Sequence, residues 1–203
     1  MNQITTGKKA DPHGDTLAPA EPARDRLIKA ASSLFCRFGI NATGVDAIVE
    51  AAGTAKATLY KAFGSKERLV EAVLEFEGKS WRNWFITSLE RYPGTPKEKL
   101  AGIFDILEEW FARDSFFGCP FINAVGEFDK REARYRDLAL AHKRIVLARI
   151  TEIAEAAGCR DATAVAHQLG VLVDGAITAA LVTGDAAVAR IARAAAVKVV
   201  AAA

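Results

Sequence analysis

Apolar residues recur every three or four positions along most of this chain, the spacing that gathers them on one face of a helix. The same long windows are filled with Ala, Leu, Glu, Lys and Arg. Because this periodicity persists through nearly the whole chain, little sequence remains for strands. The pattern predicts an all-α fold.

Glycines and prolines divide the pattern into nine helical windows. The first ends at Gly39, the second spans about two turns, and the third follows Gly53 and ends near Ala62. A long fourth helix starts at Ser65 and reaches Arg91. The remaining windows lie at about 97–114, 121–128, 132–157, 161–183 and 186–201.

Hydroxyl side chains stand where three of the early helices begin. Thr43 with Asp46 has the spacing of a capping box at the second helix. Thr54 is placed to cap the third helix and Ser65 the fourth. Gly53 permits a sharp turn before the third helix, since glycine readily adopts positive φ. The sequence therefore predicts two short helices joined by a tight turn.

The third helix has one apolar side and one polar side. On a helical wheel Leu59 and Phe63 point toward the core, opposite Ala57 and Lys61. The outward face and its flanks carry Lys56, Ala57, Thr58, Tyr60 and Lys61. This arrangement predicts a helix-turn-helix, the motif whose second helix enters the major groove of DNA.

The outward side chains suit double-stranded DNA chemically. Lys56, Lys66 and the Tyr60 hydroxyl can donate hydrogen bonds to phosphate oxygens. Ala57 can contact a thymine methyl group, and Lys61 can donate to guanine. Residues 24–66 contain seven Lys or Arg against three Asp or Glu, whereas the whole chain has a formal charge of only +2. The basic charge is therefore concentrated around this motif.

The stretch from residue 44 to 69 resembles the signature of the TetR/AcrR family of transcriptional regulators. The signature begins with Ser or Thr, where this chain has Gly44. The eight later positions agree at the family's spacing: Ile48, Ala52, Gly53, Leu59, Tyr60, Phe63, Lys66 and Leu69. Eight matches at fixed spacing make the resemblance specific.

The resemblance implies a homodimer of all-helical subunits. Each would have a DNA-binding domain, here residues 24–70 after a mobile tail at 1–23, and a larger domain for effector and partner at 71–203. Carried over by position, the DNA contacts are Thr54, Lys56, Tyr60, Lys61 and Lys66. Because Gly44 has no hydroxyl group, Thr43 is the expected substitute for the phosphate contact made from that position.

Aromatic residues crowd the first part of the larger domain. Eleven of the seventeen lie between Phe76 and Phe121. Such a cluster can line an apolar ligand cavity or form ordinary core, and the sequence leaves both readings open. The ligand-binding candidates are Trp81, Trp84, Phe85, Phe104, Trp110 and Phe117, with Cys119 and Asn123 in the loop 116–124 orienting the ligand. That loop is equally well explained as a structural turn.

The last two windows predict a subunit interface. Residues 161–183 are apolar nearly all round, so this helix must be covered on every side. Asp174 near its centre would cost about 2.5 to 3.5 kcal/mol in a bilayer, which favours a protein partner over a membrane. We expect residues 161–201 to pair with their copies in a self-complementary four-helix interface.

Catalytic and metal-binding patterns are missing from the sequence. The histidines are scattered, and Cys36, Cys119 and Cys159 are too far apart for a zinc or redox motif. We therefore expect no enzyme activity, metal or cofactor, and a cytoplasmic location. The favoured function is a repressor that a small apolar effector releases from a palindromic operator. The alternative is a constitutive or architectural DNA-binding protein without an effector.

Overall fold

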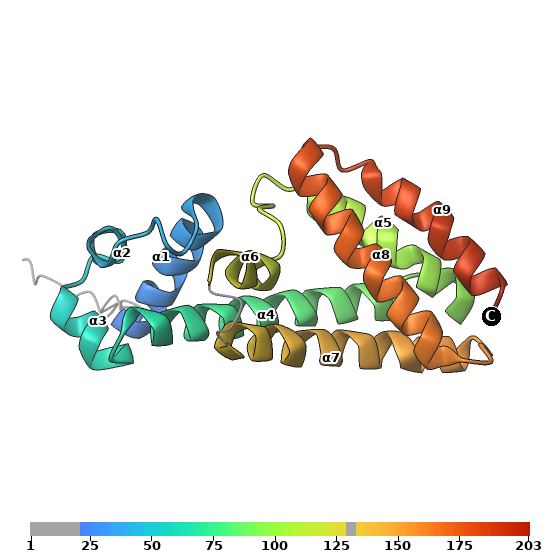
Figure 1. The fold of residues 1–203 in the computed structure, drawn as a ribbon, viewed down its shortest axis with the longest axis horizontal. Helices are drawn as coiled ribbons and strands as arrows, with labels where there is room; N and C mark the ends of the chain where they lie inside the picture. The colour runs from blue at the N-terminus through green and yellow to red at the C-terminus, as the bar shows by residue number, and fades with distance from the viewer. Residues whose placement is uncertain (1–20, 129–132) are drawn as a thin grey trace, which may run out of the picture.

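The computed structural model describes residues 21–128 and 133–203, and these residues form nine α-helices and no strand (Figure 1). The helices are α1 (Ala23–Phe38), α2 (Val45–Ala51), α3 (Lys56–Phe63), α4 (Lys66–Arg91), α5 (Pro96–Phe111), α6 (Pro120–Glu127), α7 (Ala133–Ala156), α8 (Ala162–Thr183) and α9 (Val188–Ala201). The all-α prediction is confirmed. Most of the predicted mobile tail at 1–23 lies outside the described residues.

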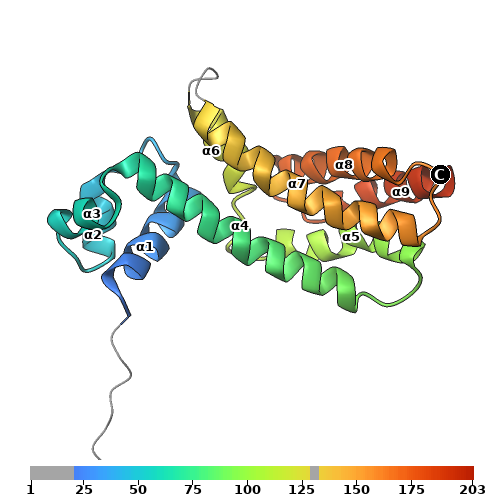
Figure 2. The same ribbon diagram turned by 90° about the horizontal axis from the view of Figure 1, so that it is seen from below.

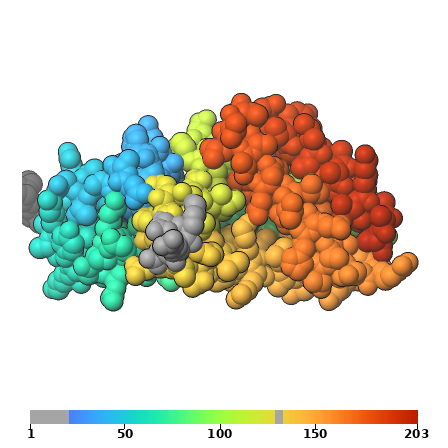
Figure 3. All heavy atoms as spheres, viewed as in Figure 1, coloured from blue at the N-terminus to red at the C-terminus, as the bar shows by residue number. Residues whose placement is uncertain are grey.

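The helices form a small unit and a larger unit that share α4. Helices α1 to α3 pack around the start of α4 at one end of the molecule (Figures 1 and 2). Helix α4 then runs into the larger unit beside α7, while α5, α8 and α9 pack together at the other end. In the space-filling view α8 and α9 make up a broad surface at that end (Figure 3).

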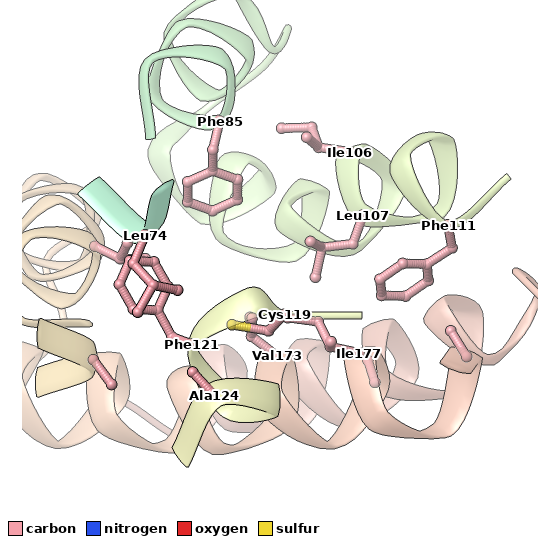
Figure 4. Close-up of a cluster of buried hydrophobic side chains, with 14 of the residues drawn as sticks. Leu74, Phe85, Ile106, Leu107, Phe111, Cys119, Phe121, Ala124, Val173 and Ile177 are labelled. Atoms are coloured by element: carbon pink, nitrogen blue, oxygen red, sulfur yellow. The ribbon is translucent and has the colours of Figure 1, made fainter. Parts of the chain in front are cut away.

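The core of the larger unit draws side chains from α4, α5, α6 and α8. Figure 4 shows Leu107, Phe121 and Val173 converging from three of these helices. Phe85 and Phe104 are fully buried, and each such apolar side chain contributes about 1.5 to 3 kcal/mol through removal from water. Burial of one apolar stripe per helix therefore fixes how the helices pack.

Side-chain caps determine where two of the helices, α4 and α5, begin. Ser65 accepts a hydrogen bond from the Arg68 N–H at 3.3 Å, so its predicted capping role is confirmed. Helix α5 begins with a capping box in which Thr95 and Glu98 each accept from the other's backbone N–H, and Pro96 occupies the first turn.

The two other predicted caps are wrong. Helix α2 starts after Gly44 and α3 after Ala55, and neither start has a side-chain cap. The Thr43 hydroxyl points back to α1 and donates to the Gly39 carbonyl oxygen at 2.7 Å. The Thr54 hydroxyl is buried without a hydrogen-bond partner among the described residues. Neither threonine therefore caps the helix that follows it.

The two units are connected through the loop that follows α1. The Glu127 carboxylate, at the end of α6, accepts hydrogen bonds from the backbone N–H groups of Ile40 at 3.1 Å and Asn41 at 2.9 Å. The Asn41 amide donates in return to the Glu127 carbonyl oxygen at 2.9 Å. Gly39 has a φ of 86°, and a Cβ there would lie 3.1 Å from the carboxylate. Glycine thus leaves room for this contact.

Replacing Glu127 by Gln is expected to lower the free energy of unfolding by about 1 to 3 kcal/mol, because the amide keeps only one acceptor oxygen for two backbone donors. Chemical denaturation followed by circular dichroism measures the change. Glu155→Gln on the exposed side of α7 is the control and should be neutral. Equal midpoints for the two variants would show that Glu127 does not stabilise the junction.

Candidate DNA-binding face and ligand cavity

Helix α3 lies at the end of the molecule farthest from α8 and α9 (Figures 1 and 2). Leu59 and Phe63 are buried, with 0% and 7% of their surfaces exposed, so their predicted orientation toward the core is confirmed. The opposite side is open to solvent and carries Lys56, Ala57, Tyr60 and Lys61. This outward surface of α3, defined by those four residues, is called the α3 face below.

The turn before α3 holds this helix away from the body of the small unit. Gly53 has a φ of 59°, a conformation that glycine adopts without steric cost. The Thr54 N–H then donates to the Val49 carbonyl oxygen at 2.9 Å, which closes the turn against the end of α2. The chain therefore reverses within a few residues and presents α3 on the outside.

The three lysines near this face have different partners. Lys56 forms an exposed ion pair with Asp46 at 2.7 Å, which raises the pKa of Lys56. Lys61 makes no ion pair within the described residues, so its ammonium group is free to meet a ligand. Lys66 donates to the Ile40 carbonyl oxygen at 2.6 Å and thereby ties α4 to the loop after α1.

Two threonines among the predicted DNA contacts need correction, and a third is half-buried. Thr43 is only 4% exposed and its hydroxyl is used within the protein, so it does not replace the missing hydroxyl of Gly44. The Thr54 hydroxyl is buried as well. Thr58 is half-buried on the flank of α3. The exposed candidates are thus the four residues of the α3 face.

A cavity of about 240 Å³ lies inside the larger unit, between α4, α6, α7 and α8. It reaches the small unit, because Cys36 of α1 is part of its wall. Four predicted ligand residues line this cavity: Trp81, Trp110, Phe117 and Cys119. The aromatic cluster therefore borders an open space as well as forming core.

The other predicted ligand residues lie elsewhere. Phe85 and Phe104 are fully buried in the core and do not line this cavity, which corrects their assignment. Trp84 borders a neighbouring surface hollow instead of the cavity. Asn123 donates from its amide to the Phe117 carbonyl oxygen at 3.0 Å, so it stabilises the loop before α6.

Polar residues that sequence analysis did not assign to a ligand site also line the cavity. Lys143 of α7 binds both carboxylate oxygens of Asp174 of α8 at 2.5 Å. The Arg82 guanidinium donates a hydrogen bond to Nδ1 of the His142 ring at 2.9 Å. Burial, followed by the charges of Arg82 and Lys143, lowers the pKa of His142 to about 4. The imidazole is therefore neutral near neutral pH.

Glu77 of α4 is a further unassigned polar residue in the cavity wall, as are Ser115 and His167. It accepts a hydrogen bond from the Ser32 hydroxyl of α1. A polar residue in an otherwise apolar helix, such as Asp174, indicates from sequence alone that a polar group lies in the interior. The periodicity of one helix does not show which polar residues of other helices line the same cavity.

The outer surface of α8 and α9 is apolar. Val171, Val182 and Ile191 are 73%, 79% and 74% exposed, although all three are large hydrophobic residues. Helix α8 is the one helix of the described chain long and apolar enough to cross a membrane, and it packs here between α7 and α9. Isolated exposed apolar residues are normal, whereas several on two helices that pack together are typical of an interaction surface.

Two family models match most of the chain. Residues 27–73 match the bacterial regulatory proteins of the tetR family, and residues 96–196 match the tetracyclin repressor-like C-terminal domain. The TetR-family regulator SCO4454 from Streptomyces coelicolor is 28% identical, with a TM-score of 0.79 over 89% of this chain and 95% of that one. A regulator from Streptomyces avermitilis is 26% identical, with a TM-score of 0.76 over 90% and 98% of the two chains.

Curated relatives match over shorter regions. The transcriptional repressor KstR2 from Mycolicibacterium smegmatis is 36% identical over 91 residues, which span 42% of each chain. The transcriptional activator FasR from the same organism is 42% identical over 57 residues, or 28% of this chain and 26% of that one. The chain thus spans less than half the length of either relative. All these similar proteins are regulators of transcription, not enzymes.

Proposed function

This chain belongs to the tetR family of transcriptional regulators, and on that premise we propose that it is a homodimeric repressor released from its operator by a small molecule. The observation that carries the proposal is the α3 face, which is solvent-exposed and basic at one end of the molecule. A regulator of this kind works in the cytoplasm, where bacterial DNA lies.

The α3 face has the chemistry for both kinds of DNA contact. Ala57 and Lys61 on its centre face the base edges, where a methyl group and a cation each recognise a different base. Tyr60 and Lys56 on its flank donate to phosphate oxygens. Lys56 exchanges the Asp46 carboxylate for a phosphate, since the ion pair is exposed and therefore weak.

The exposed apolar residues of α8 and α9 form the proposed interface between the two subunits. Val171 and Val182 share one side of α8, and Ile191 is exposed on α9, which packs against α8. Between the two valines lies Gly175, where a Cβ atom would have no neighbour within 4 Å. This open and apolar surface is suited to an isologous contact in which each subunit presents the same patch. The two α3 helices then enter successive major grooves about 34 to 36 Å apart.

The cavity links ligand binding to the DNA-binding unit. Its wall includes Cys36 of α1, Glu77 of α4 and Pro120 at the start of α6, and Glu127 at the end of α6 holds the loop after α1. A ligand that prefers a different spacing of these helices shifts the population away from the DNA-binding arrangement. The ligand-free dimer is therefore the form that binds the operator.

The alternative function is a constitutive DNA-binding protein that responds to no effector. It shares the α3 face and the dimer surface, and the two functions differ only in the use of the cavity. A space bordered by two tryptophans and several polar groups favours the ligand-responsive function. Side chains that line an empty cavity lose van der Waals contacts, and a bound ligand would restore them. The repressing direction follows the first of the curated relatives.

Selection of genomic fragments by the purified full-length protein tests the function. We expect the bound fragments to share an inverted repeat with half-sites about one helical turn, or a multiple of it, apart. Small molecules made or exported by products of the neighbouring genes should then release the protein in a gel-shift assay. Fragments without two-fold symmetry, or no bound fragment at low salt, would contradict the proposal.

A further inference from the structure

The cavity holds one charged side chain that has no counter-ion within the described residues, Glu77 of α4. From this carboxylate and the aromatic rings beside it, we propose that the effector is an amphipathic cation whose protonated amine pairs with Glu77. Its apolar body would lie among the rings of Trp81 and Trp110. The inference rests on the proposed ligand-responsive function and names the chemical class of the ligand.

The remaining charges of the cavity wall are already neutralised. Lys143 and Asp174 bind each other through both carboxylate oxygens at 2.5 Å. His142 is neutral above about pH 4 because its site is buried and lies between cations. The hydroxyl of Ser32 is the hydrogen-bond donor to Glu77, and it carries no charge. The lining residues therefore carry a net negative charge, located at Glu77, while the Arg82 guanidinium lies outside the lining and is bound to His142.

The rings beside this carboxylate favour a cation further. Trp81 lines the cavity next to Trp110, at a centroid distance of 5.6 Å with the rings edge to face. Aromatic faces attract cations, most strongly those of tryptophan, and more so where water is excluded. The same cluster already holds one cation, because the Arg113 guanidinium lies 4.6 Å from the centre of the Trp84 ring. A carboxylate flanked by tryptophans is thus complementary to an organic ammonium group.

Glu77 also stands where a ligand would enter. A surface hollow of about 490 Å³ adjoins the cavity, and both are lined by Cys36, Glu77, Trp81, Trp110, Ser115 and Phe117. A molecule that passes from the hollow to the cavity therefore meets the carboxylate and both tryptophans. The hollow is also lined by Lys29, which is paired with Glu21, and by Arg113, which lies over the Trp84 ring. Among the described residues, Glu77 therefore carries the one carboxylate that lines it.

The position of Glu77 connects the ligand to α1. Its carboxylate accepts from Ser32, and Cys36 one turn farther along α1 is part of the cavity wall. An ammonium group on Glu77 shares this carboxylate with the Ser32 hydroxyl. The effector thus acts directly at the contact between α1 and α4, where the DNA-binding unit meets the ligand-binding unit.

Calorimetry on the full-length protein with three probes tests the ligand class. Phenylbutylamine, phenylbutanol and phenylbutyrate have the same apolar body and are positive, neutral and negative near neutral pH. We expect the amine to bind at least about tenfold more tightly than the alcohol, which corresponds to about 1.4 kcal/mol, and the acid to bind most weakly. Glu77→Gln should remove the preference, whereas Glu75→Gln on the exposed side of α4 should retain it.

Absence of binding by all three probes, an alcohol that binds as tightly as the amine, or an amine preference that survives Glu77→Gln would overturn the inference. Operator binding with and without the amine is measured in parallel to keep the two proposals apart. An amine that depends on Glu77 but leaves operator affinity unchanged would support the ligand class and contradict the repressor mechanism. If all three probes lowered the protein's affinity for the operator equally, the repressor mechanism would be supported and the cationic ligand class contradicted.

Discussion

Replacing Ile191 by Arg is expected to convert the dimer into a monomer and to weaken operator binding by at least about a hundredfold. Two half-sites held by one dimer gain from effective concentration, and this gain is on the order of 100-fold to 10,000-fold. Ile191 is 74% exposed in the subunit, so the substitution leaves the fold intact. In the dimer it would bury two unpaired charges at the centre of an apolar interface.

Sedimentation or light scattering measures the oligomeric state, and a gel shift measures the affinity. Glu155→Arg, on the exposed side of α7, is the matched control and should leave both unchanged. A variant at position 191 that remains dimeric would show that α8 and α9 do not form the interface. A monomer with wild-type operator affinity would instead show that dimerisation does not determine DNA binding.

The second large effect is expected for Leu59→Ala, which should lower the free energy of unfolding of the small unit by about 2 to 5 kcal/mol. Leu59 is fully buried where α3 packs against the rest of this unit. Its truncation leaves a cavity in a core made of only three short helices and the start of α4. Thermal unfolding measures the loss, and DNA binding should disappear at temperatures where the variant is unfolded.

The neighbouring residue provides the matched comparison. Tyr60 is 49% exposed on the α3 face, so Tyr60→Ala should change the free energy of unfolding by less than about 0.5 kcal/mol. The same change should weaken binding to all DNA sequences, since it removes a phosphate contact. A stable Leu59→Ala variant, or an unfolded Tyr60→Ala variant, would contradict our assignment of Leu59 to the buried side of α3 and Tyr60 to its exposed side.

The boundaries of the helices could be predicted because single residues determine them. Gly39 and Gly64 adopt positive φ where α1 and α3 end, and Pro96 follows the break after α4. The cap at Ser65 was also predictable, since its partner is three residues away in the same helix. Each of these signals is local in the sequence.

The caps expected at Thr43 and Thr54 do not form, because the Thr43 hydroxyl bonds backward to the preceding turn and the Thr54 hydroxyl is buried without a partner among the described residues. Thr43 satisfies its hydroxyl on Gly39 at the end of α1, four residues earlier, instead of on the following helix. Lys66 behaves similarly, since its ammonium group lies against the Ile40 carbonyl oxygen across the domain. A sequence pattern identifies a donor but does not show which acceptor the fold brings closest.

The ligand cavity was predictable only in its aromatic part. The density of aromatic residues before Phe121 pointed to Trp81 and Trp110, yet it equally included Phe85, which is core. Glu77 and Lys143 lie on helices far apart in sequence and meet the cavity only because α4 packs beside α7. Helical periodicity shows which side of a helix is inward, whereas the neighbour it meets there depends on the whole fold.

The account depends most on α3 lying in the major groove as one of a symmetric pair, and DNA cleavage from that helix tests it most directly. An iron chelate is attached to the thiol introduced by Ala57→Cys, after Cys36, Cys119 and Cys159 are replaced by Ala. The same chelate at Glu152→Cys on α7 is the control. We predict two cleavage clusters on one side of the operator, about one helical turn apart or a multiple of it. A single cluster, or cleavage no stronger than the control, would contradict the account.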